Sequence, residues 1–349
     1  MMRRTRSRKK RARIVGLVLL ILVLFAGVSG AGALLWWRAQ DPLGPANPQD
    51  KEDRLFEVKA GSSLQQIARD LEQEGLLKDE RIFYWYARLS GNAARLKAGR
   101  YLLNPAMDAR TITEKLVEGK VATITFTIPE GYHLRQIAEV FAQKGIAEKE
   151  EFWEAIQNGS YNVPFLEELP PRSERWLEGY LFPDTYTVPL GTPVEKVIEV
   201  MLKRFAQIYD RLPSNNTGLT RHELVTLASI VEGESVLDEE RPIIASVFFN
   251  RLKIGQRLEA DATVQYLFDE RKERVLYRDL EIDSPYNTYR NKGLPPGPIG
   301  SPGEASLRAV LQPADTKYYY FVARKDNSGA HVFAQTLDEH NRNKRRLGY

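Results

Sequence analysis

The stretch from Phe56 to Leu76, FEVKAGSSLQQIARDLEQEGL, returns 70 residues later as FTIPEGYHLRQIAEVFAQKGI, from Phe126 to Ile146. The two copies align without a gap and are identical at eight positions. In each copy a short apolar run leads to a Gly and then to apolar residues at helical spacing, which in the first copy are Leu64, Ile67, Ala68 and Leu71. A second Gly, Gly75 in the first copy, ends this pattern. The pattern predicts a small unit of strand, turn and helix that is used twice.

Composition places this repeat in an ordinary globular protein. The chain has 349 residues, of which 43% are hydrophobic and 28% charged, so it is neither disordered, collagen-like nor a coiled coil. Its length indicates two or three domains, and we expect an α+β fold. It contains no Cys, which excludes disulfides, thiolate metal sites and Cys nucleophiles.

The basic residues are concentrated at the N-terminus. Residues 1–13 contain eight Lys or Arg and no acid, although the formal charge of the whole chain is only +4. The other residues therefore comprise 42 basic and 46 acidic side chains, a net charge of −4. This distribution argues against a nucleic-acid-binding protein, and we expect no nucleic-acid partner.

An uncharged segment of 24 residues, Ile14–Trp37, follows the basic tail. As a helix it would be roughly 36 Å long, which is enough to cross a bilayer. The cations before it and the acids after it predict a single-pass anchor in the cell (inner) membrane, with the N-terminus in the cytoplasm and the body outside. The alternative is a signal peptide cleaved after Ala31-Gly32-Ala33, but the apolar run continues to Trp37, which favours the anchor.

Beyond the anchor, the sequence predicts a Pro-broken linker and then two folded regions. The linker comprises residues 38–53, the first module 54–122 and the larger region 123–349. We divide the larger region into the second repeat copy with its connecting helices, 123–215, and a core, 216–349. Apolar spacing predicts helices over 150–157, 193–212, 221–233 and 239–252, and a hairpin formed by 318–323 and 331–333.

The first repeat copy resembles the start of a LysM repeat in its pattern Val-x-x-Gly-x-Ser-Leu-x-x-Ile-Ala, from Val58 to Ala68. This resemblance implies binding of glycans that contain N-acetylglucosamine. The alternative is that the unit is only an economical packing of a strand and a helix, because Leu, Ile and Ala are core residues in both cases. The second copy has Pro129 and Tyr132 in place of Lys59 and Ser62, and we interpret it as structural.

Several catalytic chemistries are missing from the sequence. The segment His222-Glu223-Leu224-Val225-Thr226 lacks the second His of a zinc HExxH site, and the other His residues are scattered, so we expect no metal. The sequence has no phosphate-binding loop and no nucleophile elbow, and its only Gly-rich stretch that resembles a dinucleotide-binding fingerprint lies inside the predicted anchor, so we expect no cofactor.

Glu232 is the strongest candidate for acid–base chemistry. It ends a very apolar helical segment, where the negative end of the helix dipole and the neighbouring Ile230 and Val231 disfavour its anion. A carboxyl group that stays protonated is what a general acid at a glycosidic oxygen requires. The alternative is a solvated Glu among other acids such as Glu234 and Asp238.

The loop Tyr286-Asn287-Thr288-Tyr289 precedes a rigid Pro/Gly segment, 293–299. Aromatic faces together with amide and hydroxyl groups suit a sugar chain, and a rigid backbone suits the wall of a cleft. The same composition also fits an ordered loop that packs on its own tyrosines.

Taken together, these motifs resemble the endolytic murein transglycosylase family (MltG, YceG-like). The motifs that carry the resemblance occur in this order: LEGYLFPDTY (177–186), ASIVEGE (228–234), VFFNRL (247–252), LEADATV (258–264), YNTY (286–289), GLPPGPI (293–299) and Pro302-Gly303. The resemblance extends over nearly all of the chain beyond residue 54.

This resemblance implies that Glu232 is the single catalytic glutamate. The family often has Lys between the two Glu of this motif, whereas this chain has Gly233, which removes a cation and predicts a sharper end to the helix. For the other motif residues we infer either substrate contact or structural support; they are Glu178, Tyr180, Asp184, Asn250, Asp261, Thr263, Tyr286, Asn287 and Tyr289.

The resemblance also implies the reaction: cleavage of the β-1,4 bond between N-acetylmuramic acid and N-acetylglucosamine in nascent peptidoglycan strands, with a 1,6-anhydro end as product. Peptidoglycan would be the substrate, and peptidoglycan synthases are possible partners. Two alternatives remain open. One is a muramidase-type hydrolase that uses Glu232 with Asp261 or Glu234, and the other is a non-enzymatic glycan-binding scaffold of the synthesis machinery.

Overall fold

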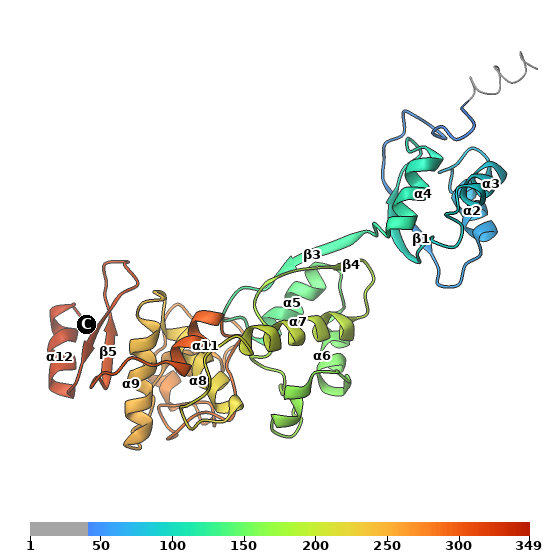
Figure 1. The fold of residues 1–349 in the computed structure, drawn as a ribbon. Helices are drawn as coiled ribbons and strands as arrows, with labels where there is room; N and C mark the ends of the chain where they lie inside the picture. The colour runs from blue at the N-terminus through green and yellow to red at the C-terminus, as the bar shows by residue number, and fades with distance from the viewer. Residues whose placement is uncertain (1–40) are drawn as a thin grey trace, which may run out of the picture. The chain divides into compact units, whose positions relative to one another are not determined.

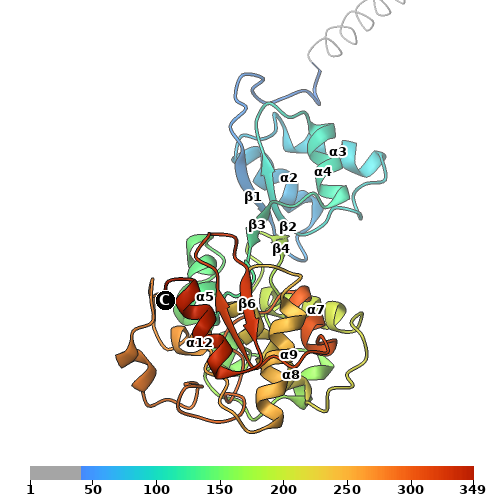
Figure 2. The same ribbon diagram turned by 90° about the vertical axis from the view of Figure 1, so that its left-hand side faces the viewer.

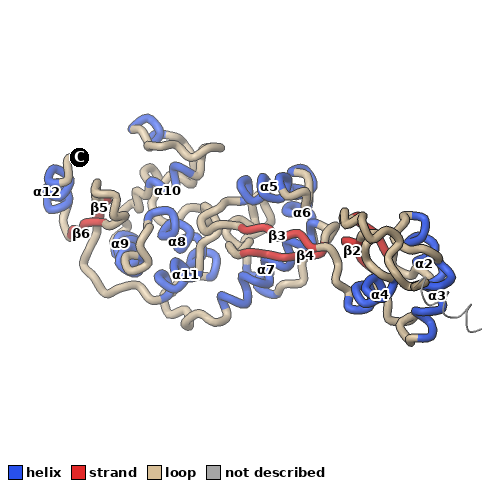
Figure 3. The backbone as a smooth tube through the Cα atoms, turned by 90° about the horizontal axis from the view of Figure 1, so that it is seen from above, coloured by secondary structure: helices blue, strands red, loops and turns tan. Residues whose placement is uncertain are grey.

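The computed structural model describes residues 41–349, which divide into two compact units that meet in the sequence between Ala122 and Thr123 (Figure 1). Helices and three two-stranded antiparallel sheets alternate along the described residues, which confirms the α+β class. Figure 3 shows these strands as short segments among helices and loops. Within residues 41–349 no helix is both long and apolar enough to cross a membrane. The predicted basic tail, 1–13, and the predicted anchor, 14–37, lie outside the described residues.

The first unit is a hairpin whose strands are separated by two helices. Phe56 lies opposite Tyr101 in the strand pair, and both side chains are buried with those of Leu71, Phe83 and Ile112. The hydroxyl of Ser63 caps the first helix by accepting a hydrogen bond from the backbone N–H of Gln66. In chain order the elements are β1 (Arg54–Val58), α2 (Leu64–Gln73), α3 (Glu80–Leu89), β2 (Gly99–Leu103) and α4 (Ala109–Glu118).

The part of the predicted linker that the structure describes, residues 41–53, is bound to this first unit. Leu43 packs against its core, and the Leu43 carbonyl accepts a hydrogen bond of 2.8 Å from Ala109 N–H. The Asp50 carbonyl accepts another, of 3.0 Å, from Ala106 N–H. This part of the linker therefore packs on the first unit, because its backbone carbonyls pair with the start of α4 and the loop before it.

The second unit begins with the second repeat copy. Its strand β3 (Thr123–Thr127) pairs with β4 (Thr185–Pro189), and Phe126 stacks on Tyr186 with ring centroids 5.4 Å apart. Between the two strands lie α5 (Leu134–Gln143), α6 (Lys149–Asn158) and the 3-10 helix η1 (Pro164–Glu168); α7 (Val194–Tyr209) follows β4. The predicted strand, turn and helix are confirmed in both copies, and Gly61 and Gly131 take φ values of +81° and +77° in the two turns. Each copy pairs its strand with a later segment of its own unit.

The rest of the second unit is built around α8 (Arg221–Glu234), whose residues from Leu224 to Val231 are all buried. This helix contacts α9 (Arg241–Lys253), α10 (Asp261–Gln265) and α11 (Glu304–Leu311), and Figure 2 shows α8 next to α9. The remaining elements are the 3-10 helix η2 (Tyr277–Glu281), the hairpin of β5 (Tyr320–Ala323) and β6 (His331–Ala334), and α12 (Leu337–Arg346). This hairpin confirms the sequence prediction.

Two helix boundaries differ from the prediction. The helix expected over 193–212 ends at Tyr209, and α8 continues through Gly233 to Glu234. Gly233 is therefore not a helix stop. A Cβ atom at this position would lie 2.6 Å from the Cβ of Ala262, so Gly233 allows α10 to approach α8. As a result, Glu232 and Glu234 both project from the last turn of one helix.

Candidate active site

A cleft of about 1480 Å³ opens in the second unit. One wall is formed by the turn of the second repeat copy, residues 130–133, and by the C-terminal end of α8. The rest comes from α10, the loop before η2 and the C-terminal hairpin. The predicted residues Glu232, Asp261 and Tyr289 all line this cleft.

Glu232 is held in the cleft wall through both of its carboxylate oxygens. Its Oε1 accepts a hydrogen bond of 2.9 Å from Nη1 of Arg241, and its Oε2 accepts one of 2.9 Å from the backbone N–H of Gly303. The side chains of Glu232 and Arg241 are each only 7% exposed, so the alternative of a solvated Glu at a helix end is wrong. A carboxyl group that accepts on both oxygens, once from a guanidinium, is fixed in its orientation.

Arg241 is the cation that contacts Glu232 in this structure. It comes from α9 and is fixed by two further hydrogen bonds, from Nε to Asp238 at 2.9 Å and from Nη1 to the hydroxyl of Ser306 at 2.6 Å. Its guanidinium therefore has a defined orientation toward Glu232. No local pattern in the sequence indicates this role for Arg241, because the contact depends on how α9 packs against α8.

A second carboxyl group, that of Glu130, lies beside Glu232 in the cleft. Partial desolvation and the charge of Glu232 raise the pKa of Glu130, although Arg241 opposes this shift. Glu130 belongs to the turn of the second repeat copy, where the first copy has Ala60. The interpretation of the second copy as structural only is therefore incomplete, because its turn lines the cleft.

Close backbone packing fixes the position of Glu130. The N–H of Gly131 donates to the carbonyl of Ser301 at 2.8 Å, and the N–H of Ser301 donates to the carbonyl of Tyr132 at 2.8 Å. A Cβ atom at Gly303 would lie 1.9 Å from Oε1 of Glu130, and a Cβ atom at Gly131 would lie 3.8 Å from Cγ of Glu232. The loop 301–303 therefore touches both carboxyl groups.

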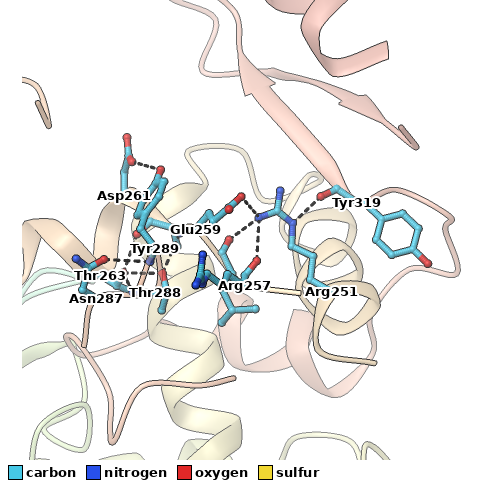
Figure 4. A network of polar contacts seen from close by, with 11 residues as sticks. Arg251, Arg257, Glu259, Asp261, Thr263, Asn287, Thr288, Tyr289 and Tyr319 are labelled. Carbon is cyan, nitrogen blue, oxygen red and sulfur yellow. Dashed lines mark hydrogen bonds and ion pairs between the residues drawn. The ribbon is translucent and has the colours of Figure 1, made fainter. Parts of the chain in front are cut away.

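Asp261 and Tyr289 meet on another part of the cleft wall. The Tyr289 hydroxyl donates a hydrogen bond of 2.6 Å to Oδ1 of Asp261 (Figure 4). Next to them, Glu234 accepts a hydrogen bond of 3.0 Å from Ala262 N–H at the start of α10. Burial raises the pKa of Glu234 to about 7. This second acidic group of the motif therefore supports α10 as well as lining the cleft.

None of the other seven predicted residues lines the cleft, and three of them come from the segment 178–184. Glu178 is 3% exposed and accepts hydrogen bonds of 2.9 Å from the N–H of Leu134, at the start of α5, and from the hydroxyl of Tyr266. Burial raises the pKa of Glu178 to about 7. The buried Tyr180 hydroxyl bonds to Nδ1 of His222 at 3.0 Å. Asp184 forms an ion pair of 2.7 Å with Arg204 in a separate, smaller depression.

The remaining predicted residues hold the loops that carry the cleft. Asn250 donates to the carbonyls of Thr316 and Tyr318 at 3.0 and 2.9 Å. Asn287 is buried and donates to two carbonyls of the preceding loop, at Leu280 and Ile282. The hydroxyls of Thr263 and Thr288 lie 2.8 Å apart, and the ring of Tyr286 packs on that of Tyr266 with centroids 5.0 Å apart.

Arg251 joins the loop before α10 to the C-terminal segment. Its Nη1 donates to the carbonyl of Leu258 at 2.7 Å and its Nε donates to the carbonyl of Tyr319 at 2.6 Å (Figure 4). Within residues 41–349 no cluster of three or more His, Asp or Glu side chains could hold a metal ion. The lining of the cleft contains carboxyl groups with polar and aromatic neighbours.

Known proteins that are similar to this chain agree with one another in the family that they indicate. An endolytic murein transglycosylase of Bacillus subtilis (strain 168) is 37% identical over 329 residues, which are 90% of this chain and 89% of that one. An endolytic murein transglycosylase of Streptococcus pneumoniae serotype 2 (strain D39) is 33% identical over 362 residues, 95% of this chain and 65% of that one. A crystal structure of a putative YceG-like protein from Listeria monocytogenes is 37% identical in sequence and superposes with a TM-score of 0.55. The match covers 84% of this chain and 100% of that one.

The sequence model of the YceG-like family matches residues 56–346, which include both units and every residue of the cleft wall described above. This match and the two transglycosylase relatives show that the chain belongs to the YceG-like family.

Proposed function

We propose that this protein is a peptidoglycan lytic transglycosylase that cuts glycan strands internally. Two relatives with more than 30% identity are named endolytic murein transglycosylases, and they align with at least 90% of this chain. The observation that carries the proposal is the carboxylate of Glu232, which is fixed by Arg241 and Gly303 in the wall of a large open cleft.

The bond to be cleaved is the β-1,4 bond between N-acetylmuramic acid and N-acetylglucosamine. The oxygen that leaves C1 needs a proton, and the C6 hydroxyl of the muramic acid must lose one as its oxygen closes on C1. Because the nucleophile belongs to the substrate, no water is consumed and the product has a 1,6-anhydro end. In the simplest scheme Glu232 performs both proton transfers, first as acid and then as base.

Recognition of the glycan would rest on shape and hydrogen bonding. Outside the N-terminal tail the chain has a net charge of −4, and peptidoglycan is itself anionic, so electrostatic attraction does not favour binding. The cleft offers aromatic rings instead, including those of Tyr132 and Tyr289. Rings of this kind present an apolar face and a hydroxyl group together, which suits a sugar.

The place of action follows from the sequence of the first 40 residues. Ile14–Trp37 anchors the protein in the cell membrane, and residues 41–349 work outside it, where nascent strands are made. The first unit, with its LysM-like pattern at 58–68, binds the same polymer, and internal cleavage ends strand elongation. Deletion of residues 1–40 should move the protein from the membrane fraction to the soluble fraction; retention of the shortened protein on membranes would contradict the anchor.

Digestion of purified sacculi tests the activity. The detergent-solubilised full chain is incubated with sacculi in ¹⁸O-labelled water, and the products are separated and weighed. We expect 1,6-anhydro ends without ¹⁸O, and no products from Glu232→Gln. The surface variant Glu139→Gln, whose carboxylate pairs with Lys149 on the outside of α5 and α6, serves as the matched control. Reducing ends that carry ¹⁸O would instead identify a muramidase-type hydrolase, and absence of any cleavage would favour the binding scaffold.

A further inference from the structure

The contacts of Glu232 raise a question about the source of the proton. A single carboxyl group can perform both transfers only if it starts protonated. The two oxygens of Glu232 instead each accept a hydrogen bond, one from Arg241 and one from Gly303 N–H, and donors of this kind, a guanidinium above all, are typical partners of a catalytic base. A group held in this way is prepared to accept a proton, so the proton for the leaving oxygen should come from another group.

Glu130 is placed to supply that proton. It lines the same cleft, and its Oε1 lies against Gly303, the residue whose N–H binds Glu232. In the described part of the chain no hydrogen-bond donor contributes to stabilising the Glu130 carboxylate. Its surroundings thus differ from those of Glu232, which has two such donors.

The charges around Glu130 favour its protonated form. Partial desolvation, Glu232 from α8 and Asp238 from the α8–α9 loop raise the pKa of Glu130, and Arg241 from α9 opposes them. Arg241 donates to Glu232 and to Asp238 but forms no ion pair with Glu130. A carboxyl group beside other carboxyl groups favours its own protonated form, which is the form that a general acid needs.

We propose that Glu130 is a second catalytic residue of the transglycosylase reaction: it enters the reaction protonated and acts as the general acid, while the Glu232 carboxylate acts as the base. This inference rests on the proposed function. The Glu130 proton passes to the glycosidic oxygen as its bond to C1 breaks and the electron pair stays on that oxygen. The C6 oxygen forms the new bond to C1, and its proton passes to Glu232. Transfer of one proton from Glu232 back to Glu130 restores the starting state.

The repeat in the sequence agrees with this assignment. The two copies are identical at the glycine of the turn, Gly61 and Gly131, but the residue just before it is Ala60 in the first copy and Glu130 in the second. The first copy belongs to the first unit, whereas the described residues that line the cleft belong to the second. A carboxyl group therefore occurs in the copy whose turn forms the cleft wall.

The test separates acid catalysis from structural support by varying the leaving group. The detergent-solubilised full chain is assayed on murein strands and on an oligosaccharide of the same repeat whose terminal muramic acid carries a nitrophenyl aglycone. A nitrophenolate leaves without a proton, so a missing general acid matters little for it. For Glu130→Gln we expect a loss of at least ~100-fold on murein and less than ~10-fold on the aryl glycoside. Glu232→Gln should lose activity on both substrates.

Three outcomes would overturn the assignment of Glu130. One is activity of Glu130→Gln on murein within about threefold of the wild type, and another is an equal loss on both substrates, which indicates structural support. The third concerns the pH profile, because the wild-type rate on murein should fall as pH rises through the pKa of the general acid. If the residual activity of Glu130→Gln falls over the same pH range, Glu130 is not that acid. Glu139→Gln is the folded control. If the wild type yields reducing ends, the proposed function fails; if it yields anhydro ends while Glu130→Gln stays active, only this inference fails.

Discussion

Replacement of Gly303 by Ala tests the arrangement of the two carboxyl groups without removing either of them. The new Cβ would lie 1.9 Å from Oε1 of Glu130, whereas an ordinary contact between carbon and oxygen is close to 3.4 Å. The Glu130 carboxyl must therefore move by about 1.5 Å. Gly303 has φ −73°, which Ala adopts without strain, and its backbone N–H still donates to Glu232. The substitution thus displaces Glu130 and leaves the anchoring of Glu232 in place.

A displacement of this size has a calculable effect on the rate. Misplacing a reacting group by about 1 Å costs on the order of 100-fold. We therefore expect Gly303→Ala to lower kcat/KM on murein by about 100-fold, or about 2.7 kcal/mol of transition-state stabilisation. Because Glu130 is a long side chain facing the cleft, it can move without disturbing the core, and Tm should change by no more than a few degrees.

The double variant Gly303→Ala/Glu130→Gln provides the control. If Gly303→Ala acts through Glu130, adding it to Glu130→Gln should cause little further loss, because the two changes remove the same contribution. Rates are measured on murein strands from the release of anhydro ends. Activity of Gly303→Ala within about threefold of the wild type would refute the reasoning, and so would two losses that simply multiply in the double variant.

Three further predictions concern stability. Arg241→Met leaves the buried Glu232 carboxylate without its cation and should lower the free energy of unfolding, measured by urea denaturation, by about 3 kcal/mol. A loss below about 1 kcal/mol would show that water replaces the guanidinium. Glu178 and Glu234 have folded pKa values of about 7, above the usual value, so they contribute stability at low pH that is lost as pH rises from about 5 through 7. Glu178→Gln should flatten that part of the stability curve, and an unchanged curve would contradict the cause. Gly233→Ala places a Cβ 2.6 Å from that of Ala262 and should cost about 1 to 3 kcal/mol; Gly233→Ala/Ala262→Gly should recover most of it, unless Gly233 is needed for another reason.

The parts of the fold that depend on neighbours in the sequence were predictable. Apolar spacing and glycine turns identify both repeat copies, and the C-terminal hairpin follows from its short turn. The pairing of β1 with β2 and of β3 with β4 was not predictable, because two helices separate the first pair of strands and still more chain separates the second. Gly233 shows the same limit, since a glycine needed for close helix packing has the sequence pattern of a helix end.

The candidate site shows a similar division. Glu232 could be selected from its apolar helix and its motif, whereas Arg241 and Glu130 reach it only through tertiary packing. The motifs that contain Glu178 and Asn287 did not indicate whether these residues contact substrate or support the structure. Both side chains are buried and satisfy backbone groups, at the start of α5 and in the loop before Tyr289 respectively. Burial and hydrogen-bond partners of this kind depend on the fold as a whole.

The backbone pairing of the turn 131–132 with Ser301 also determines when the enzyme becomes active during its production. Chain growth delivers Glu130 first, then Glu232, and the Gly303 N–H only 71 residues after Glu232. A chain interrupted before residue 303 therefore contains both carboxyl groups but lacks the loop that holds them together. We therefore expect a fragment that ends before residue 303 to cut no glycan, whether it arises from interrupted synthesis or from proteolysis.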